Sequence, residues 1–363
     1  MKSHLAVDVE AGMPKSDKNG MNFKKFRLVA LVFISCSAIN LVAAQVQAQP
    51  SPVAPAALAE GESRSIDEWL ARMHEAAKKR AYVGTFVVSS GGTMTSAKIW
   101  HVCDGSQQME RVDMLSGAPR STFRHNDQVV TFMPEHKVVR HEKRDSLGGF
   151  PQFLQTTDSR IADFYAVRTG GVERVAGVEA DIVTLQPKDT LRFGYRVWTE
   201  RKRGLVVKLQ TLDLDGKVLE QAAFSELQLD APLKMDKLVQ MMGKVDGYRV
   251  EKPALVKTTA SAEGWSVKLP VAGFKPVSCY KRPSSSAEAA GDEPLQWIFS
   301  DGLASVSVFV EPVDKQRPDK ESTLSLGATQ TLTRQVNNHW ITVMGEVPMA
   351  TLRLFASSIE RKK

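Results

Sequence analysis

Residues 82–103, with the sequence YVGTFVVSSGGTMTSAKIWHVC, decide the fold. Apolar and polar side chains alternate on both sides of Gly91-Gly92, and this period of two is typical of β-strands joined by a tight turn. We therefore expect strands over residues 82–89 and 94–103. So short a connection joins antiparallel neighbours, because a parallel crossover needs a dozen residues or more. The stretch predicts the first hairpin of an antiparallel sheet.

The alternation continues as far as Leu229. Further strands are expected over residues 109–115, 121–125, 128–133, 137–142, 172–175, 179–186, 191–199, 205–211 and 218–229. Short turns containing Gly, Pro, Asn or Asp separate many of them. Between the first strand and residue 243, only two short helices are expected, over residues 159–168 and 232–242.

One helix precedes the strands. Ser65-Ile66-Asp67-Glu68 is a capping box, and the residues that follow place Ile66, Trp69, Leu70, Met73 and Ala77 on one face at helical spacing. We expect this face to pack on the sheet. A sheet so long, with so few helices, covers its inner face by curving. The sequence therefore predicts a large antiparallel half-barrel with covering helices.

A smaller module follows. Strands are expected over residues 265–270, 273–277, 295–300, 303–311, 328–334 and 339–346, and a final helix over residues 349–360 places Leu352, Phe355, Ala356 and Ile359 on one face. We predict a half-barrel domain at residues 63–243, a linker at 244–263 and a small α+β domain at 264–363. The fold class is α+β, mostly β.

The first residues predict export. Lys24-Lys25-Phe26-Arg27 is a basic segment, residues 28–42 are mostly apolar, and small residues follow up to Ala48. This order is typical of a secretory signal peptide. We expect residues 1–48 to be a signal peptide with an upstream extension and residues 49–62 to be a flexible leader. Two alternatives stay open: a membrane anchor, although the apolar run is shorter than the roughly 20 residues of a spanning helix, and a lipoprotein attached at Cys36.

Composition and motifs argue against several classes of function. Residues 1–48 contain six of the 48 Lys/Arg and three of the 41 Asp/Glu, so the remainder carries a net charge of +4, which is small for a nucleic-acid-binding protein. No catalytic or phosphate-binding motif is present, so no enzyme activity and no cofactor are expected. His136 and His141 are five residues apart, on opposite faces of a strand, and no metal site is expected. Cys103 and Cys279 fall in different predicted domains, which favours free thiols over a disulfide.

Five segments together carry a family resemblance. They are Leu115-Ser116-Gly117-Ala118-Pro119-Arg120-Ser121, Tyr195-Arg196-Val197-Trp198, residues 212–220, Ser300-Asp301-Gly302-Leu303 and residues 340–348. In this order they resemble the MucB/RseB family, over about residues 65–360. The resemblance implies a periplasmic regulator whose N-terminal domain shares the LolA/LolB half-barrel. Ser116 and Ser121 depart from the charged residues usual in the family, so ion pairs are not expected there.

The resemblance also implies partners. The expected protein partner is the periplasmic domain of a MucA/RseA-type anti-sigma factor, which the chain would protect from proteolysis and release on sensing lipid or lipoprotein stress signals. Its expected contacts are Arg282, Asp301, Gly302, Leu303 and Trp340. Acyl chains of lipopolysaccharide or lipoprotein are expected in a groove lined by Phe86, Trp100, Met109, Phe132, Phe150, Phe153, Phe193, Tyr195 and Trp198. The alternative function is a periplasmic carrier of the LolA/LolB type, and self-association stays open.

Overall fold

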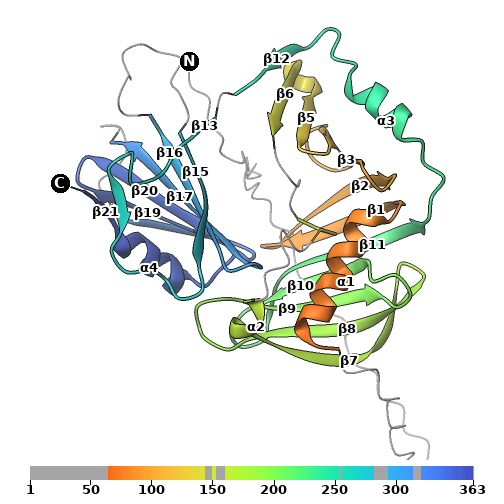
Figure 1. Ribbon diagram of the computed structural model, residues 1–363, viewed down its shortest axis with the longest axis horizontal. Coiled ribbons are helices and arrows are strands. Elements are labelled where there is room, and N and C mark those ends of the chain that lie inside the picture. The colour runs from red at the N-terminus through yellow and green to blue at the C-terminus, as the bar shows by residue number, and fades with distance from the viewer. Residues whose placement is uncertain are drawn as a thin grey trace, which may run out of the picture. The chain divides into compact units, whose positions relative to one another are not determined.

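The computed structural model describes residues 64–143, 149–152, 160–253, 255–281, 293–313 and 320–362. These residues form a 12-stranded sheet, here called the large sheet, and a seven-stranded sheet, here called the small sheet (Figure 1). The predicted mostly β class, with a large antiparallel sheet before a small β domain, is confirmed. None of the helices in these ranges is long and apolar enough to cross a membrane.

The large sheet has the strand order β12-β6-β5-β4-β3-β2-β1-β11-β10-β9-β8-β7. Its strands are β1 (Tyr82–Ser90), β2 (Thr93–Cys103), β3 (Gln108–Met114), β4 (Ser121–His125), β5 (Gln128–Met133), β6 (Val138–Lys143), β7 (Tyr165–Val175), β8 (Val178–Pro187), β9 (Gly194–Glu200), β10 (Val206–Leu212), β11 (Val218–Leu229) and β12 (Arg249–Glu251). The sheet curls, because β7 contacts β11 although three strands lie between them. Val175 and Ala176, at the end of β7, pack against the core that contains Phe86 and Phe224.

Two helices cover the two faces of this sheet. Helix α1 (Ile66–Lys79) begins at the Ser65 capping box, and its predicted apolar stripe is buried. It packs on the face that carries Tyr195 and Val197, here called the inner face. Helix α3 (Met235–Met242) packs on the opposite face, here called the outer face, against Met109 and Phe132. The prediction of helices together in the mouth of a half-barrel is therefore wrong for α3, whose Leu238 and Met242 lie on the outer face.

Three element predictions in the large sheet are also wrong. The helix expected over residues 159–168 is a single turn, α2 (Ile161–Phe164), and β7 begins at once, with Gly170-Gly171 inside the strand at a register shift. The strand expected from Leu191 begins only at Gly194, so residues 191–193 form a connection. The predicted linker contains β12, which pairs in parallel with β6, whereas only antiparallel pairs were expected.

The small sheet has the strand order β13-β15-β16-β17-β20-β19-β18. Its strands are β13 (Val256–Lys257), β15 (Lys275–Lys281), β16 (Leu295–Ser300), β17 (Ser305–Pro312), β18 (Ser322–Leu326), β19 (Thr329–Val336) and β20 (His339–Gly345). Helix α4 (Met349–Ser358) buries Leu352, Phe355 and Ala356 on one face, as predicted. The strands β14 (Trp265–Val267) and β21 (Ile359–Arg361) form a separate pair. The sequence patterns missed β13, β18 and β21.

Candidate binding sites at the sheet junction and on the large sheet

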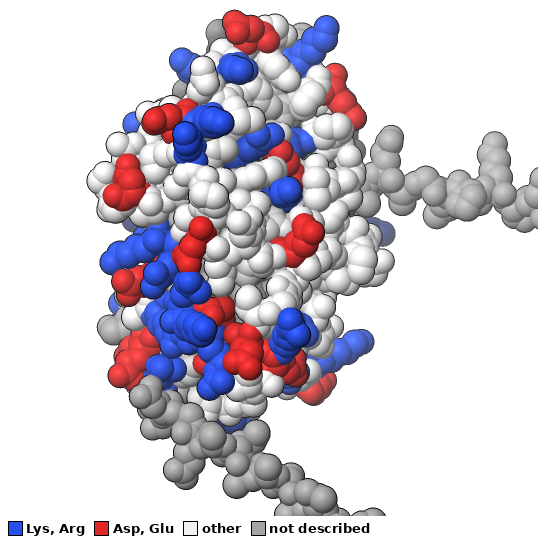
Figure 2. Space-filling view, turned by 90° about the vertical axis from the view of Figure 1, so that its right-hand side faces the viewer, with Lys and Arg blue, Asp and Glu red and all other residues white. Residues whose placement is uncertain are grey.

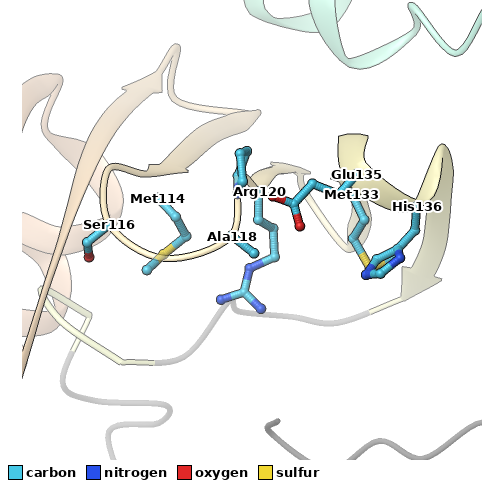
Figure 3. Close-up of a pocket in the computed structure, with 8 residues that line it drawn as sticks. Met114, Ser116, Ala118, Arg120, Met133, Glu135 and His136 are labelled. Carbon is cyan, nitrogen blue, oxygen red and sulfur yellow. The ribbon is translucent and has the colours of Figure 1, made fainter. Parts of the chain in front are cut away.

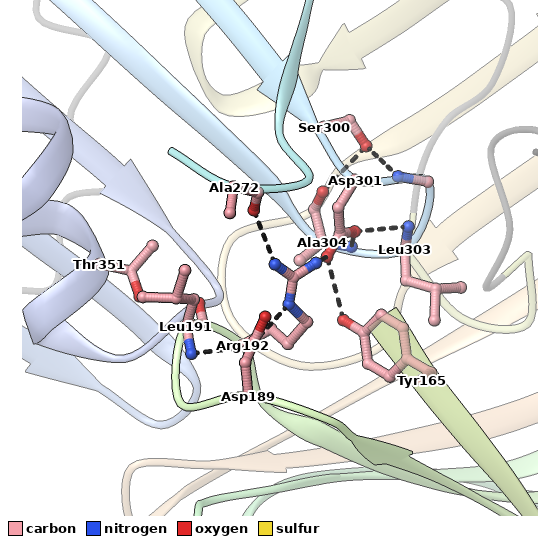
Figure 4. Close-up of polar contacts among 11 residues, drawn as sticks. Tyr165, Asp189, Leu191, Arg192, Ala272, Ser300, Asp301, Leu303, Ala304 and Thr351 are labelled. Atoms are coloured by element: carbon pink, nitrogen blue, oxygen red, sulfur yellow. Dashed lines mark hydrogen bonds and ion pairs between the residues drawn. The ribbon is translucent and has the colours of Figure 1, made fainter. Parts of the chain in front are cut away.

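The turn between β16 and β17 lies where the two sheets meet (Figure 4). Asp301 accepts hydrogen bonds at Oδ1 from the backbone N–H groups of Leu303, at 2.9 Å, and Ala304, at 2.8 Å. Gly302, between Asp301 and Leu303, has a φ of 104°, a conformation that glycine adopts without a steric penalty. The turn therefore aims the second carboxylate oxygen of Asp301 away from its own strands.

That oxygen meets Arg192, from the connection between β8 and β9. Arg192 Nη1 donates to Asp301 Oδ2 at 2.8 Å, and neither side chain is exposed to solvent. Tyr165 Oη donates to the same oxygen at 3.2 Å. A buried ion pair is stable only where further hydrogen bonds satisfy both groups, and Figure 4 shows that condition met around Asp301.

The rest of the Arg192 guanidinium is satisfied as well. Nε donates to Asp189 Oδ1 at 3.0 Å, and Nη2 donates to the backbone oxygen of Ala272 at 2.8 Å. The guanidinium lies 4.4 Å from the centroid of the Phe164 ring, a cation–π distance. Gly273, next to this contact, has a φ of +84°, and a Cβ there would come within 2.9 Å of Arg192 Nη1. Glycine at 273 therefore lets the backbone approach the guanidinium.

Apolar contacts reinforce the junction from both sides. Leu303 packs against the large-sheet core that contains Tyr165 and Tyr195, and Leu191 packs against the small-sheet core. Thr351, on α4, donates to the backbone oxygen of Leu191 at 2.7 Å. Each sheet thus inserts a turn into the core of the other.

Burial sets the charge states at the junction. It raises the pKa of the Asp301 carboxyl, and the N–H groups of Leu303 and Ala304 with the Arg192 charge oppose that rise. Burial also raises the pKa of Tyr165 well above its ordinary value, so its hydroxyl stays a neutral donor. We find no nucleophile paired with a base here; the arrangement joins two sheets.

The residues predicted to contact the protein partner do not form one surface. Asp301, Gly302 and Leu303 come together and face the large sheet. Trp340 is buried in β20, where it is 2% exposed. Arg282 lies outside the described residues. Sequence reasoning missed Arg192, for which the one signal is its position between Leu191 and Phe193 in an apolar run.

The predicted groove residues lie on both faces of the large sheet. Phe86 and Tyr195 are on the inner face, and the Phe150 ring packs 5.4 Å from that of Phe86. Three lie on the outer face: Trp100, Met109 and Phe132. Trp198, in contrast, packs in the core that contains Phe86. Phe193 is buried before β9, and Phe153 lies outside the described residues. One groove lined by all nine is therefore wrong, because one sheet separates them.

A surface pocket lies elsewhere on the large sheet (Figure 3). It has a volume of about 260 Å³ and lies between the β3–β4 turn and the short helix η1 (Pro134–His136). Its lining residues are Met114, Ser116, Ala118, Pro119, Arg120, Met133, Glu135 and His136. None of the predicted groove or partner residues lines it.

The described residues group no metal ligands, and the face drawn in Figure 2 carries charges of both signs. Across these ranges, no three His, Cys, Asp or Glu side chains are grouped so as to hold a metal ion. On the face shown in Figure 2, basic and acidic side chains lie interspersed. Arg201, for example, pairs with Asp181 at 3.1 Å.

Comparisons with known proteins cover nearly all of the folded chain. The family model described as the MucB/RseB N-terminal domain matches residues 65–242, and the MucB/RseB C-terminal domain matches residues 259–360. "Sigma factor AlgU regulatory protein MucB" of Pseudomonas aeruginosa is 28% identical, over 82% of this chain and 92% of the relative. "Sigma-E factor regulatory protein RseB" of Haemophilus influenzae is 23% identical, over 84% and 93%.

Two solved structures are similar over a comparable length. One is a crystal structure of MucB in complex with MucA(peri); this chain is 26% identical to it over 82% of this chain and 98% of that one, with a TM-score of 0.62. The other is the MucA/MucB complex of Pseudomonas aeruginosa, 26% identical over 82% and 99%, with a TM-score of 0.64. Both similarities extend across the two sheets.

Proposed function

The chain belongs to the MucB/RseB family, and from this premise we propose that it binds the periplasmic domain of a MucA-type anti-sigma factor. The relatives are named as regulatory proteins, and the chain is a regulator rather than an enzyme. The observation that carries the proposal is the similarity to MucB in complex with MucA(peri), which spans both sheets. By binding the periplasmic domain of the anti-sigma factor, the protein would shield that domain from proteolysis.

We propose that the small sheet and the edge of the junction form the dock. Residues 63–243 and 264–363 would act as two domains joined by residues 244–263, a segment whose β12 extends the large sheet and whose β13 extends the small sheet. The separate cores of the two sheets support this division. Asp301 and Leu303 would act indirectly, by fixing the small sheet against the large one. Arg282 is the proposed direct contact, because arginine pairs with carboxylates in a bidentate way and is common among interface anchors.

Titration of a MucA-type periplasmic domain against the purified protein tests this proposal. We expect binding, and we expect Arg282→Ala to weaken it by about 30-fold, the loss typical of an anchor residue. Arg353→Ala, which removes an exposed arginine of helix α4, is the control and should change the affinity less than about fivefold. Absence of binding by the unaltered protein would contradict the function. Binding that Arg282→Ala leaves unchanged would contradict only the position of the dock.

We also propose a periplasmic location, with residues 1–48 removed on export. The basic and apolar segments before Ala48 support this proposal, and these residues lie outside the described ranges. The intact mass of the protein released from the periplasm should equal that of the chain without this segment. A mass that still includes residues 21–48 would show that the signal peptide is retained.

We also propose that the protein senses lipid through the large sheet. Acyl chains, from lipopolysaccharide or lipoprotein, would bind at the inner face and favour release of the anti-sigma factor. The aromatic cluster of Phe86, Phe150 and Phe224 beside α1 supports an apolar site there. A carrier of the LolA/LolB type would bind acyl chains without binding the anti-sigma factor, so the titration above separates the two functions.

A further inference from the structure

The pocket between the β3–β4 turn and η1 has one arginine, Arg120, beside an apolar floor. Met114 and Met133 lie on the inner face of the sheet, and Ala118 and Pro119 come from the turn (Figure 3). Arg120 follows Pro119 at the edge of the same pocket. Across the described ranges, the Arg120 side chain makes no hydrogen bond and no ion pair. It is thus available to an anionic group.

The size of the pocket limits what it can hold. Its volume of about 260 Å³ is smaller than the roughly 300–1,000 Å³ of pockets that enclose drug-sized ligands. Met114 also packs against the inner-face core around Phe86 and Phe224. One large side chain fits these dimensions, whereas a long acyl chain would need a deeper channel.

We propose that this pocket binds an acidic peptide, with one large apolar side chain on the Met114 and Met133 floor and a neighbouring carboxylate on Arg120. Methionine suits the floor, because its flexible thioether adapts to different apolar groups. Arginine suits the rim, because its planar guanidinium binds a carboxylate through two parallel hydrogen bonds. Glu135, at the same rim, would repel a carboxylate placed on its side and so orient the peptide toward Arg120. The site extends beyond the proposed function, since it lies on the large sheet and does not depend on which protein supplies the peptide.

Methyl NMR of the purified protein, with labelled methionine ε-methyl groups, tests the proposal. The probe is the peptide acetyl-Gly-Leu-Asp-Gly-amide, and Met114→Leu and Met133→Leu assign the two signals. We expect saturable shifts of the Met114 and Met133 signals, and at least about tenfold weaker binding by Arg120→Ala. Arg353→Ala is the matched control and should leave the binding unchanged. Because Arg120 is exposed and unpaired, its variant should keep the remaining methyl signals in place.

Two further ligands make the test decisive. A peptide with Lys in place of Asp should give no saturable shift, because its charge matches that of Arg120. Equal shifts with both peptides, or none with either, would overturn the proposal. Shifts that appear with decanoate and not with the acidic peptide would also overturn it, since they would assign the pocket to a lipid.

Discussion

Replacement of Arg192 by leucine is expected to lower the free energy of unfolding by about 3–5 kcal/mol, the usual cost of removing one partner of a buried ion pair. The variant leaves the Asp301 carboxylate inside the protein without its cation, and it leaves the Ala272 carbonyl without a donor. Urea unfolding at neutral pH, followed by tryptophan fluorescence, measures the change. We expect both sheets to lose stability, because each contributes a turn to the junction.

Two controls separate the buried pair from charge in general. Arg353→Ala breaks an exposed pair with Glu321 and should cost less than about 1 kcal/mol. The double variant Arg192→Leu/Asp301→Asn should recover part of the loss, because asparagine still accepts the backbone hydrogen bonds but carries no charge. If Arg192→Leu lowered the free energy of unfolding by less than about 1 kcal/mol, the buried Arg192–Asp301 pair would not stabilise the junction.

The cost should also depend on pH. Burial raises the folded-state pKa of Asp301 above its unfolded value, so the carboxyl favours the folded state below the unfolded pKa of about 3.8 and loses that contribution as the pH rises through the folded pKa. Without the Arg192 charge, the pKa of Asp301 in the folded protein rises further, so the stabilising contribution of this carboxyl is lost over a wider pH range. The difference in the free energy of unfolding between Arg192→Leu and the unaltered protein should therefore be larger at pH 7 than at pH 4.

Replacement of Trp69 by alanine is expected to cost about 3–5 kcal/mol, because it leaves a cavity under α1. Trp69 is 2% exposed and packs in the core that contains Ile161 and Tyr195. Trp69→Phe is the control and should cost much less, since the indole N–H has no hydrogen-bond partner to lose. Thermal unfolding monitored by circular dichroism compares the three proteins.

The same variant tests where acyl chains bind. If they occupy the inner face, Trp69→Ala enlarges their site, and a fluorescent fatty acyl probe should bind more tightly. Phe132→Ala opens a cavity of similar kind on the outer face and should leave the probe's affinity unchanged. Tighter binding by Phe132→Ala alone would move the proposed site to the outer face, and no binding by any of the proteins would contradict lipid sensing.

The sequence predicted strands well where turn residues mark them. β4, β5 and β11 have the predicted bounds, and Asn126, in the turn between β4 and β5, has the positive φ that its residue type favours. The helix expected over residues 159–168 failed because Tyr165 is buried in the core beside α1, so tertiary packing extends the chain there.

Candidate sites were predicted less well, for two physical reasons. A period of two assigns alternate residues to opposite faces but does not say which face is inside, so the predicted groove mixed Phe86 with Phe132. Asp301-Gly302 has the local signature of a turn, yet the group that decides its role is Arg192, which is 109 residues away in sequence. Nothing local to either segment indicates that pairing.

The parallel pairing of β12 with β6 sets the length of the tether between the two sheets. Glu251 at the end of β12 is held by Arg140 at 3.2 Å, and β13 of the small sheet begins at Val256. Only residues 252–255 join them, and four residues span at most about 14 Å. So short a tether keeps the small sheet near the junction at an effective concentration on the order of millimolar or more. Any molecule that inserts at the junction thus competes with an intramolecular neighbour, and its apparent affinity falls by the fraction of time that the junction is closed.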